Sequence, residues 1–189
     1  MEAARGQVAE GGYASASVQA VARRAGVATG SVYRHFPSKA ELFAEVFRRA
    51  SQRELDVVAA VTGDESLPPG ERVAAAVDAF ARRALAAPVM AYALLAEPVD
   101  PAVEAERLVF RRAYRDAFVT AIAEGIAAGE LPEQDAELSA AALVGALGEA
   151  LVGPLSPTAS PRDEDRLIAA LVAFCLRSVC NEEPAHVHA

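Results

Sequence analysis

Glycine and proline divide this chain into segments of about helix length, and this punctuation limits the folds open to it. The 12 glycines and 11 prolines stand mostly between stretches rich in Ala, Leu, Glu and Arg, which have high helix propensity. Aromatic residues make up only 6% of the chain, and no stretch sustains the apolar/polar alternation of a strand. We therefore expect an all-α protein of about nine helices. Their predicted ranges are residues 1–11, 17–25, 29–35, 38–61, 71–86, 89–97, 101–128, 134–152 and 160–180.

The polar inventory gives little support to an enzyme or a metalloprotein. Cys175 and Cys180 lie five residues apart on one predicted helix and point in different directions, so they form neither a disulfide nor a metal pair. The histidines are His35, His186 and His188, and no cluster has the spacing of metal ligands or a catalytic triad. We expect no metal, no cofactor and no catalytic residues. A helical enzyme that uses Tyr92 or Tyr114 is a distant alternative.

Charge is distributed unevenly along the chain. The net charge is −8, but residues 1–53 hold eight basic and four acidic residues, whereas residues 54–189 hold ten basic and twenty-two acidic ones. A small basic head that meets phosphate, followed by a larger acidic body, explains this asymmetry. We place the head at residues 1–47, the body at residues 48–182 and a frayed tail at residues 183–189.

The sequence predicts a cytoplasmic protein with no membrane partner. Its N-terminus carries Glu2 and Arg5 and lacks the continuous apolar region of a signal peptide. The uncharged apolar stretch of residues 138–148 is too short to span a bilayer.

Two short helices of the head have the pattern of a helix-turn-helix. Gly26 permits a left-handed turn between them. In this layout the second helix enters the DNA major groove, and the first crosses the backbone. A plain amphipathic hairpin with a solvated polar face is the alternative that the pattern alone leaves open. The apolar positions expected to share one small core are Val18, Val21, Ala22, Val27, Val32 and Phe36.

The combined string in this region resembles the DNA-binding domain of the tetracycline-repressor (TetR) family. The resemblance covers 35 to 40 residues and rests on Gly12-Tyr13, Ser17-Val18, Ala25-Gly26-Val27, the ten residues from Gly30 to Lys39, and Leu42-Phe43. It implies a three-helix DNA-binding domain, a hinge through the fourth helix, and a helical ligand-binding and dimerisation domain. Such proteins are typically homodimers that bind palindromic operators, usually as repressors, and release double-stranded DNA when a small-molecule effector binds.

The resemblance also assigns roles to residues of the head. The positions that match phosphate-contacting residues are Ser17, Tyr33, His35 and Lys39, and those that match the groove-facing set are Thr29, Gly30, Ser31 and Arg34. Ala28 stands where a polar residue often caps the recognition helix, so we expect Thr29 to supply that cap.

An aromatic stripe marks the longest helix predicted in the body. Phe110, Tyr114 and Phe118 recur at i, i+4 spacing, and Arg111, Arg112, Arg115 and Asp116 are expected to lie away from that stripe. Such a stripe is plain core more often than pocket wall, and both interpretations stay open. The candidate ligand-binding residues are Phe80, Met90, Tyr92, Phe110, Tyr114 and Phe118, and they favour a small, mostly apolar effector.

The last two predicted helices are apolar over more than one face. Leu143, Leu147 and Leu151 form a row beside Gly145 and Gly148. A helix that is apolar nearly all round is buried nearly all round, and a second copy of the chain can supply the cover. The sequence thus predicts a homodimeric, ligand-responsive repressor. The alternative is an all-α small-molecule sensor or binding protein whose helix-turn-helix is vestigial.

Overall fold

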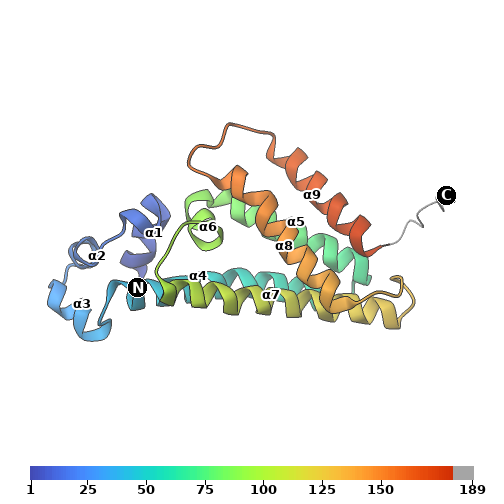
Figure 1. Cartoon of the computed structure of the whole chain (residues 1–189), viewed down its shortest axis with the longest axis horizontal. Coiled ribbons are helices and arrows are strands. Elements are labelled where there is room, and N and C mark those ends of the chain that lie inside the picture. The colour runs from blue at the N-terminus through green and yellow to red at the C-terminus, as the bar shows by residue number, and fades with distance from the viewer. Residues whose placement is uncertain (181–189) are drawn as a thin grey trace.

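The computed structural model describes residues 1–180, so the predicted tail of residues 183–189 lies outside it. Within these residues the chain is all-α and contains nine helices, as expected (Figure 1). Their bounds are α1 Glu2–Ser15, α2 Val18–Ala25, α3 Thr29–His35, α4 Lys39–Thr62, α5 Pro69–Ala86, α6 Pro88–Leu95, α7 Pro101–Ala127, α8 Ala136–Leu155 and α9 Glu164–Val179.

The first three helices and the start of α4 form a head at one end of the molecule (Figure 1). Val8, Val18 and Val21 pack there against Phe43 and Phe47 of α4. The predicted small core is confirmed except at Val27, which is 47% exposed. Gly26 ends α2 in the left-handed conformation (φ 68°), and Val27 follows it in the turn rather than on the inner face of α3.

The body has its own core, built around two long helices that lie side by side, α4 and α7 (Figure 1). Val58 of α4 and Phe118 and Ile122 of α7 belong to this core, together with apolar residues of α5, α8 and α9. Because α4 contributes to both cores, it connects head and body as one continuous helix.

Capping residues fix several helix starts. Ser17 accepts from the Ala20 amide at 3.2 Å, and Ser38 accepts from the Glu41 amide at 3.1 Å, so α2 and α4 begin where these side chains satisfy free N–H groups. The Glu41 carboxylate in turn accepts from the Ser38 hydroxyl at 3.4 Å.

Three local features differ from the sequence-based expectation. The ninth helix begins at Glu164, because Asp163 caps it, and not at residue 160. Ala28, not Thr29, is the N-cap residue of α3, and no side chain caps this helix. Finally, α1 does not end at Gly11-Gly12 but continues to Ser15 beyond a kink at Gly12 (φ 74°).

Candidate DNA-binding head and ligand cavity

The outer face of α3 presents the predicted DNA-contacting side chains together. Tyr33, Arg34 and His35 are exposed, whereas Val32 faces the core of the head. Gly30 is also exposed, and a Cβ built there would have no neighbour within 4 Å. Thr29 and Ser31 are half-buried on the first turn. This arrangement gives a small polar surface whose hydroxyl, guanidinium and imidazole groups can bond to phosphate oxygens and base edges.

The remaining two predicted contacts, Ser17 and Lys39, are engaged within the head. The Ser17 hydroxyl caps α2. Lys39 Nζ donates to the Tyr13 carbonyl at 3.3 Å and lies 4.5 Å from the centre of the Tyr13 ring. An ammonium group has three donors, so Lys39 can keep this contact and still donate to a phosphate.

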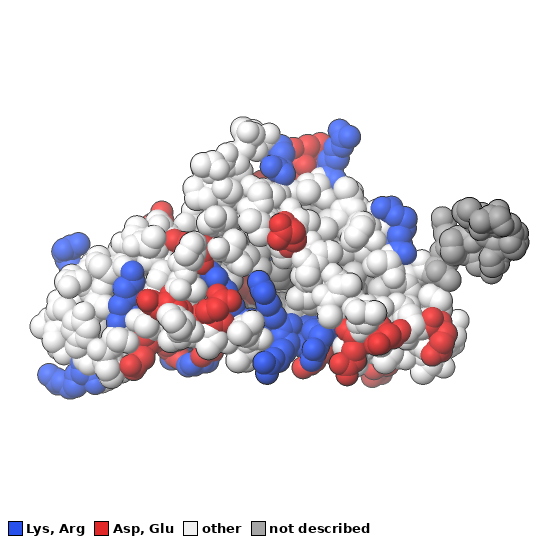
Figure 2. All heavy atoms as spheres, viewed as in Figure 1, with Lys and Arg blue, Asp and Glu red and all other residues white. Residues whose placement is uncertain are grey.

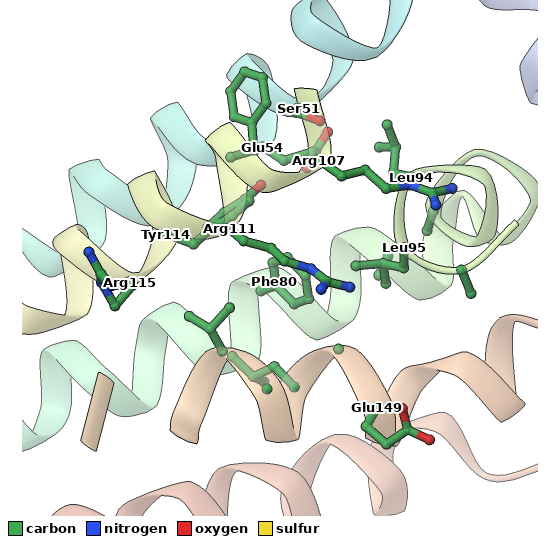
Figure 3. A pocket seen from close by; sticks show the side chains of 18 of the residues that line it. Ser51, Glu54, Phe80, Leu94, Leu95, Arg107, Arg111, Tyr114, Arg115 and Glu149 are labelled. Carbon is green, nitrogen blue, oxygen red and sulfur yellow. The ribbon is translucent and has the colours of Figure 1, made fainter. Parts of the chain in front are cut away.

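A cavity of about 800 Å³ lies in the body, bounded by residues of α4 through α8 (Figure 3). This volume is within the range of about 300–1,000 Å³ that is usual for small-molecule sites. Phe80 and Tyr114 meet edge to face on its wall, with ring centres 5.5 Å apart. The candidate ligand-binding residues that line the cavity are Phe80, Met90, Phe110, Tyr114 and Phe118.

Tyr92, the sixth candidate, is not in the lining. It is half-buried against the body core instead. On α6 the cavity is lined by Met90, Ala91, Leu94 and Leu95, and a residue two positions after Met90 is turned by about 200° around a helix. The helical period therefore points Tyr92 away from the cavity.

Polar groups at the cavity come mainly from arginines that were not among the predicted ligand-binding residues. Arg111, Arg112 and Arg115, which we expected to lie away from the stripe, are part of the lining. The cavity is therefore wider than the face of α7 that carries the stripe. Arg107 and Arg83 line it as well. Arg83 donates to Glu54 at 3.1 Å, and burial, with the Glu54 charge nearby, raises the pKa of the Tyr114 hydroxyl.

The helix α6, with the loop that follows it, touches both the cavity and the head, as α4 does. In that loop, Glu97 accepts from the Tyr13 amide at 2.7 Å and the Ala14 amide at 2.9 Å. These amides lie just beyond the kink at Gly12. Arg107 donates to the carbonyls of Ala93 and Glu97 and so fixes the end of α6. We call this set of contacts the Glu97 clamp.

The cysteines and acidic residues of the described chain offer no reactive or metal centre. Cys175 and Cys180 are free thiols, and burial raises the pKa of Cys175 to about 11, which keeps it protonated and unreactive. Residues 1–180 contain no group of three or more His, Cys, Asp or Glu side chains placed to hold a metal ion.

Large apolar side chains are exposed on the last two helices. Leu138 of α8 is 67% exposed and Phe174 of α9 is 52% exposed, while Gly145 and Gly148 leave open space above α8. In the described chain, α8 is the one helix long and apolar enough to cross a membrane by composition. A helix that packs against another protein surface has the same composition.

A helix-turn-helix head joined to a helical body with a ligand-sized cavity defines a class, the DNA-binding regulators that respond to small molecules. Residues 1–46 match the family model for bacterial regulatory proteins of the tetR family, and residues 66–151 match that for the C-terminal domain of tetracycline-repressor-like proteins. The chain belongs to the TetR family of transcriptional regulators. Regulators of this family are generally not enzymes.

Solved structures share the fold over nearly the whole chain. FadR from Bacillus subtilis, in complex with stearoyl-CoA, has a TM-score of 0.79 and 19% identity, with 94% of this chain and 96% of FadR covered. A TetR/AcrR regulator from Thermobifida fusca has a TM-score of 0.73 and 24% identity, covering 93% of each chain. RolR with resorcinol has a TM-score of 0.70 and 21% identity, covering 94% of this chain and 84% of RolR. A sequence comparison with curated proteins finds no match.

Proposed function

We propose that this TetR-family regulator is a repressor that leaves a palindromic operator when a small, mostly apolar molecule fills the cavity between α4 and α8. The observation that carries this proposal is the Glu97 clamp. It attaches the segment that lines the cavity directly to the head that presents α3. A ligand can change DNA affinity only if it binds one arrangement of the two parts better than the other.

The cavity lining supports an effector with a large apolar part. Four apolar residues of α6 and the rings of Phe80, Phe110 and Phe118 face the space. The relatives do not select a single ligand, since FadR was solved with stearoyl-CoA and RolR with resorcinol. Displacement of the α6 wall by a bound molecule would move Glu97, and with it the amides of α1 that Glu97 holds.

The palindromic operator follows from a dimer. The exposed apolar faces of α8 and α9 suit an isologous interface, in which the same patch of each subunit contacts its copy. Two heads related by a two-fold axis would then read two inverted half-sites. Since members of the family bind DNA inside the cell, we propose a cytoplasmic location as well.

The second candidate is a small-molecule sensor with a vestigial helix-turn-helix. It is favoured by two observations: the whole chain carries a net charge of −8, and Ser17 and Lys39 are engaged within the head. The exposed set on α3 favours the repressor, because Tyr33, Arg34 and His35 are all exposed at the end of this helix.

Selection of binding sites from random duplex DNA tests the proposal. The full chain is expected to recover an inverted repeat, and a variant with Thr29→Ala and Arg34→Ala is expected to recover none. When the recovered site is placed in a promoter, the protein should lower expression of a reporter. Increased expression would make the protein an activator. Failure of the unmodified chain to enrich any sequence would favour the vestigial sensor.

A further inference from the structure

We propose that the effector is an amphiphilic anion, with an apolar chain in the cavity and an acidic head group beside the arginines of α7. This inference deepens the proposed function and rests on it for the identity of the site. Its evidence is the distribution of charge around the cavity, the position of two guanidinium groups and the lack of carboxylate partners for two arginines.

Basic side chains are concentrated at the cavity although the body is acidic. Five of the ten basic residues that follow position 53 line it, but only two of the twenty-two acidic ones, Glu54 and Glu149. The lining therefore carries a formal charge of +3 within a region whose overall charge is −12. Figure 2 shows basic side chains gathered along the middle of α7, between groups of acidic ones. Such a concentration attracts anions to the cavity.

Two guanidinium groups lie where a head group would sit. Figure 3 shows Arg107 and Arg111 extending from α7 toward α6, whereas Arg115 points the other way. The side chain of Arg107 is only 9% exposed, and its Nε atom is buried without a hydrogen-bond partner in the described chain. Arg111 is exposed above the apolar floor formed by Phe80 and Leu95. An acid placed here would meet the open guanidinium of Arg111, beside that of Arg107, which Glu104 and the Ala93 and Glu97 carbonyls already hold.

Three carboxylates near the cavity already pair with arginines of its lining. Glu54 pairs with Arg83, Glu104 with Arg107, and Asp116 with Arg115. Arg111 and Arg112 form no ion pair with any residue from 1 to 180. A neutral ligand that covered Arg111 would remove water from an unpaired charge, which is unfavourable. A carboxylate or phosphate would replace that water with charge-assisted hydrogen bonds, often two to one guanidinium.

The experiment compares matched pairs of ligands on the full-length protein by titration calorimetry. Laurate, palmitate and stearate are each paired with the alcohol of the same chain, and palmitoyl-CoA supplies a phosphate-bearing head group. The acid, the acyl-CoA or both should bind at least about tenfold more tightly than the alcohol, and added salt should weaken the binding of the anions alone. If palmitate binds more tightly than palmitoyl-CoA, the preferred head group is a carboxylate. If palmitoyl-CoA binds more tightly, it is a phosphate.

A double variant with Arg111→Gln and Arg112→Gln should lose about tenfold in affinity for the anions and less than about twofold for the alcohols. The matched control is Arg162→Gln with Arg166→Gln, which removes the same charge from exposed arginines outside the cavity lining. The control should bind like the unmodified protein. Because all four arginines are exposed, circular dichroism should show folded protein in each case.

Three results would overturn the inference: alcohols that bind as tightly as the acids, an equal loss for both ligand types in the arginine variant, or no binding by any probe. None of these results would affect the recovery of an inverted repeat from random DNA. The proposed function and the anionic effector can therefore fail separately.

Discussion

Arg34 and Lys39 lie close together in the sequence but differ in environment. Arg34 is exposed on the outer face of α3, whereas Lys39 is half-buried at the start of α4 with its Nζ on the Tyr13 carbonyl. A side chain that projects freely into the groove can report on base identity, and one anchored beside the groove is suited to the phosphate backbone. The two substitutions below should therefore have different effects.

For Lys39→Ala we expect weaker binding to every duplex. Each neutralised phosphate contributes about 0.9 to the slope of log affinity against log salt, so the slope should fall by up to about 2 per dimer. Affinity is measured on the selected operator and on a scrambled duplex over a range of salt concentrations. Thermal unfolding of the variant is measured in parallel, because Lys39 also contacts Tyr13.

For Arg34→Ala we expect relaxed preference at particular operator positions, by about 1 to 3 kcal/mol for a bidentate contact to a base. The loss of preference is measured as binding to operators that each carry a single base substitution. The assigned roles are reversed if Arg34→Ala lowers affinity uniformly and Lys39→Ala changes the preference. If neither change affects DNA binding, the head is vestigial.

Tyr114 provides a test of the cavity. Tyr114→Ala removes a ring from the cavity wall and leaves Phe80 without its edge contact, so ligand-dependent release from DNA should change while DNA affinity without ligand stays within about twofold. Tyr92→Ala is the matched control, since it removes the same ring from a position outside the lining. Electrophoretic mobility shifts with and without ligand measure DNA affinity and ligand-dependent release for both variants. Equal effects of the two substitutions on release would argue against the cavity.

The sequence predicted the cavity residues only in part, for a physical reason. The spacing of Phe110, Tyr114 and Phe118 follows the helix period and identifies one face of α7. Periodicity does not show how wide a cavity opens beside that face, and it therefore missed the arginines. Tyr92 was misplaced because α6 is apolar on all sides, and such a helix does not reveal which side faces the cavity.

At the level of elements, capping chemistry explains which helix ends could be predicted. The start of α4 follows the capping side chain of Ser38, whereas α7 begins at Pro101, and the Asp100 side chain makes no capping hydrogen bond. Both signals are local in sequence. The continuation of α1 past Gly12 depends on Glu97, which is 84 residues away from the Tyr13 amide it accepts from. No local pattern carries that information.

The Glu97 clamp connects α6 to α1 and yields a prediction about coupling. Glu97→Ala leaves the Tyr13 and Ala14 amides without their acceptor, and we expect the free energy of unfolding to fall by about 1 to 3 kcal/mol. Ligand affinity should persist, but the ligand should lose most of its effect on DNA affinity. Chemical denaturation and DNA titrations with and without ligand measure these quantities.

Two further variants make this test specific. Glu97→Gln keeps an acceptor oxygen and should restore part of the coupling, whereas Glu133→Ala removes an exposed acid from the turn after α7 and should change nothing. If the ligand changes the DNA affinity of the Glu97→Ala variant as much as that of the unmodified protein, then α4, the other connection between body and head, transmits the signal alone.

At the level of the whole molecule, the exposed apolar faces of α8 and α9 predict the oligomeric state. Phe174→Asp places a charge in the proposed interface and should convert the dimer to monomer at micromolar concentration. The control is Val109→Asp, because Val109 is 56% exposed on α7 and lies outside α8, α9 and the cavity lining. Phe174 is a better probe than Gly145, which also lines the cavity.

Sedimentation velocity distinguishes the outcomes. The unmodified protein and the Val109→Asp variant should sediment as dimers, and the Phe174→Asp variant should also bind the palindrome no better than a half-site. A monomeric unmodified protein, or a dimer that Phe174→Asp leaves intact, would place the interface elsewhere. The all-round apolar character of α8 and α9 leads the sequence to predict that a second copy covers these helices, and this stays a prediction until sedimentation tests it.

The kink in α1 limits how this sequence can diverge. Gly12 has a φ of 74° and a ψ of −178°, a backbone conformation that is essentially restricted to glycine, and a Cβ there would also lie 2.8 Å from a Glu97 carboxylate oxygen. Glu97 in turn accepts from amides that an unkinked helix would bond internally. In descendants and relatives that keep this connection, glycine at position 12 and an acid at position 97 should be inherited together. A lineage that loses the glycine at position 12 should soon lose the acid at position 97, and a lineage that loses the acid should soon lose the glycine.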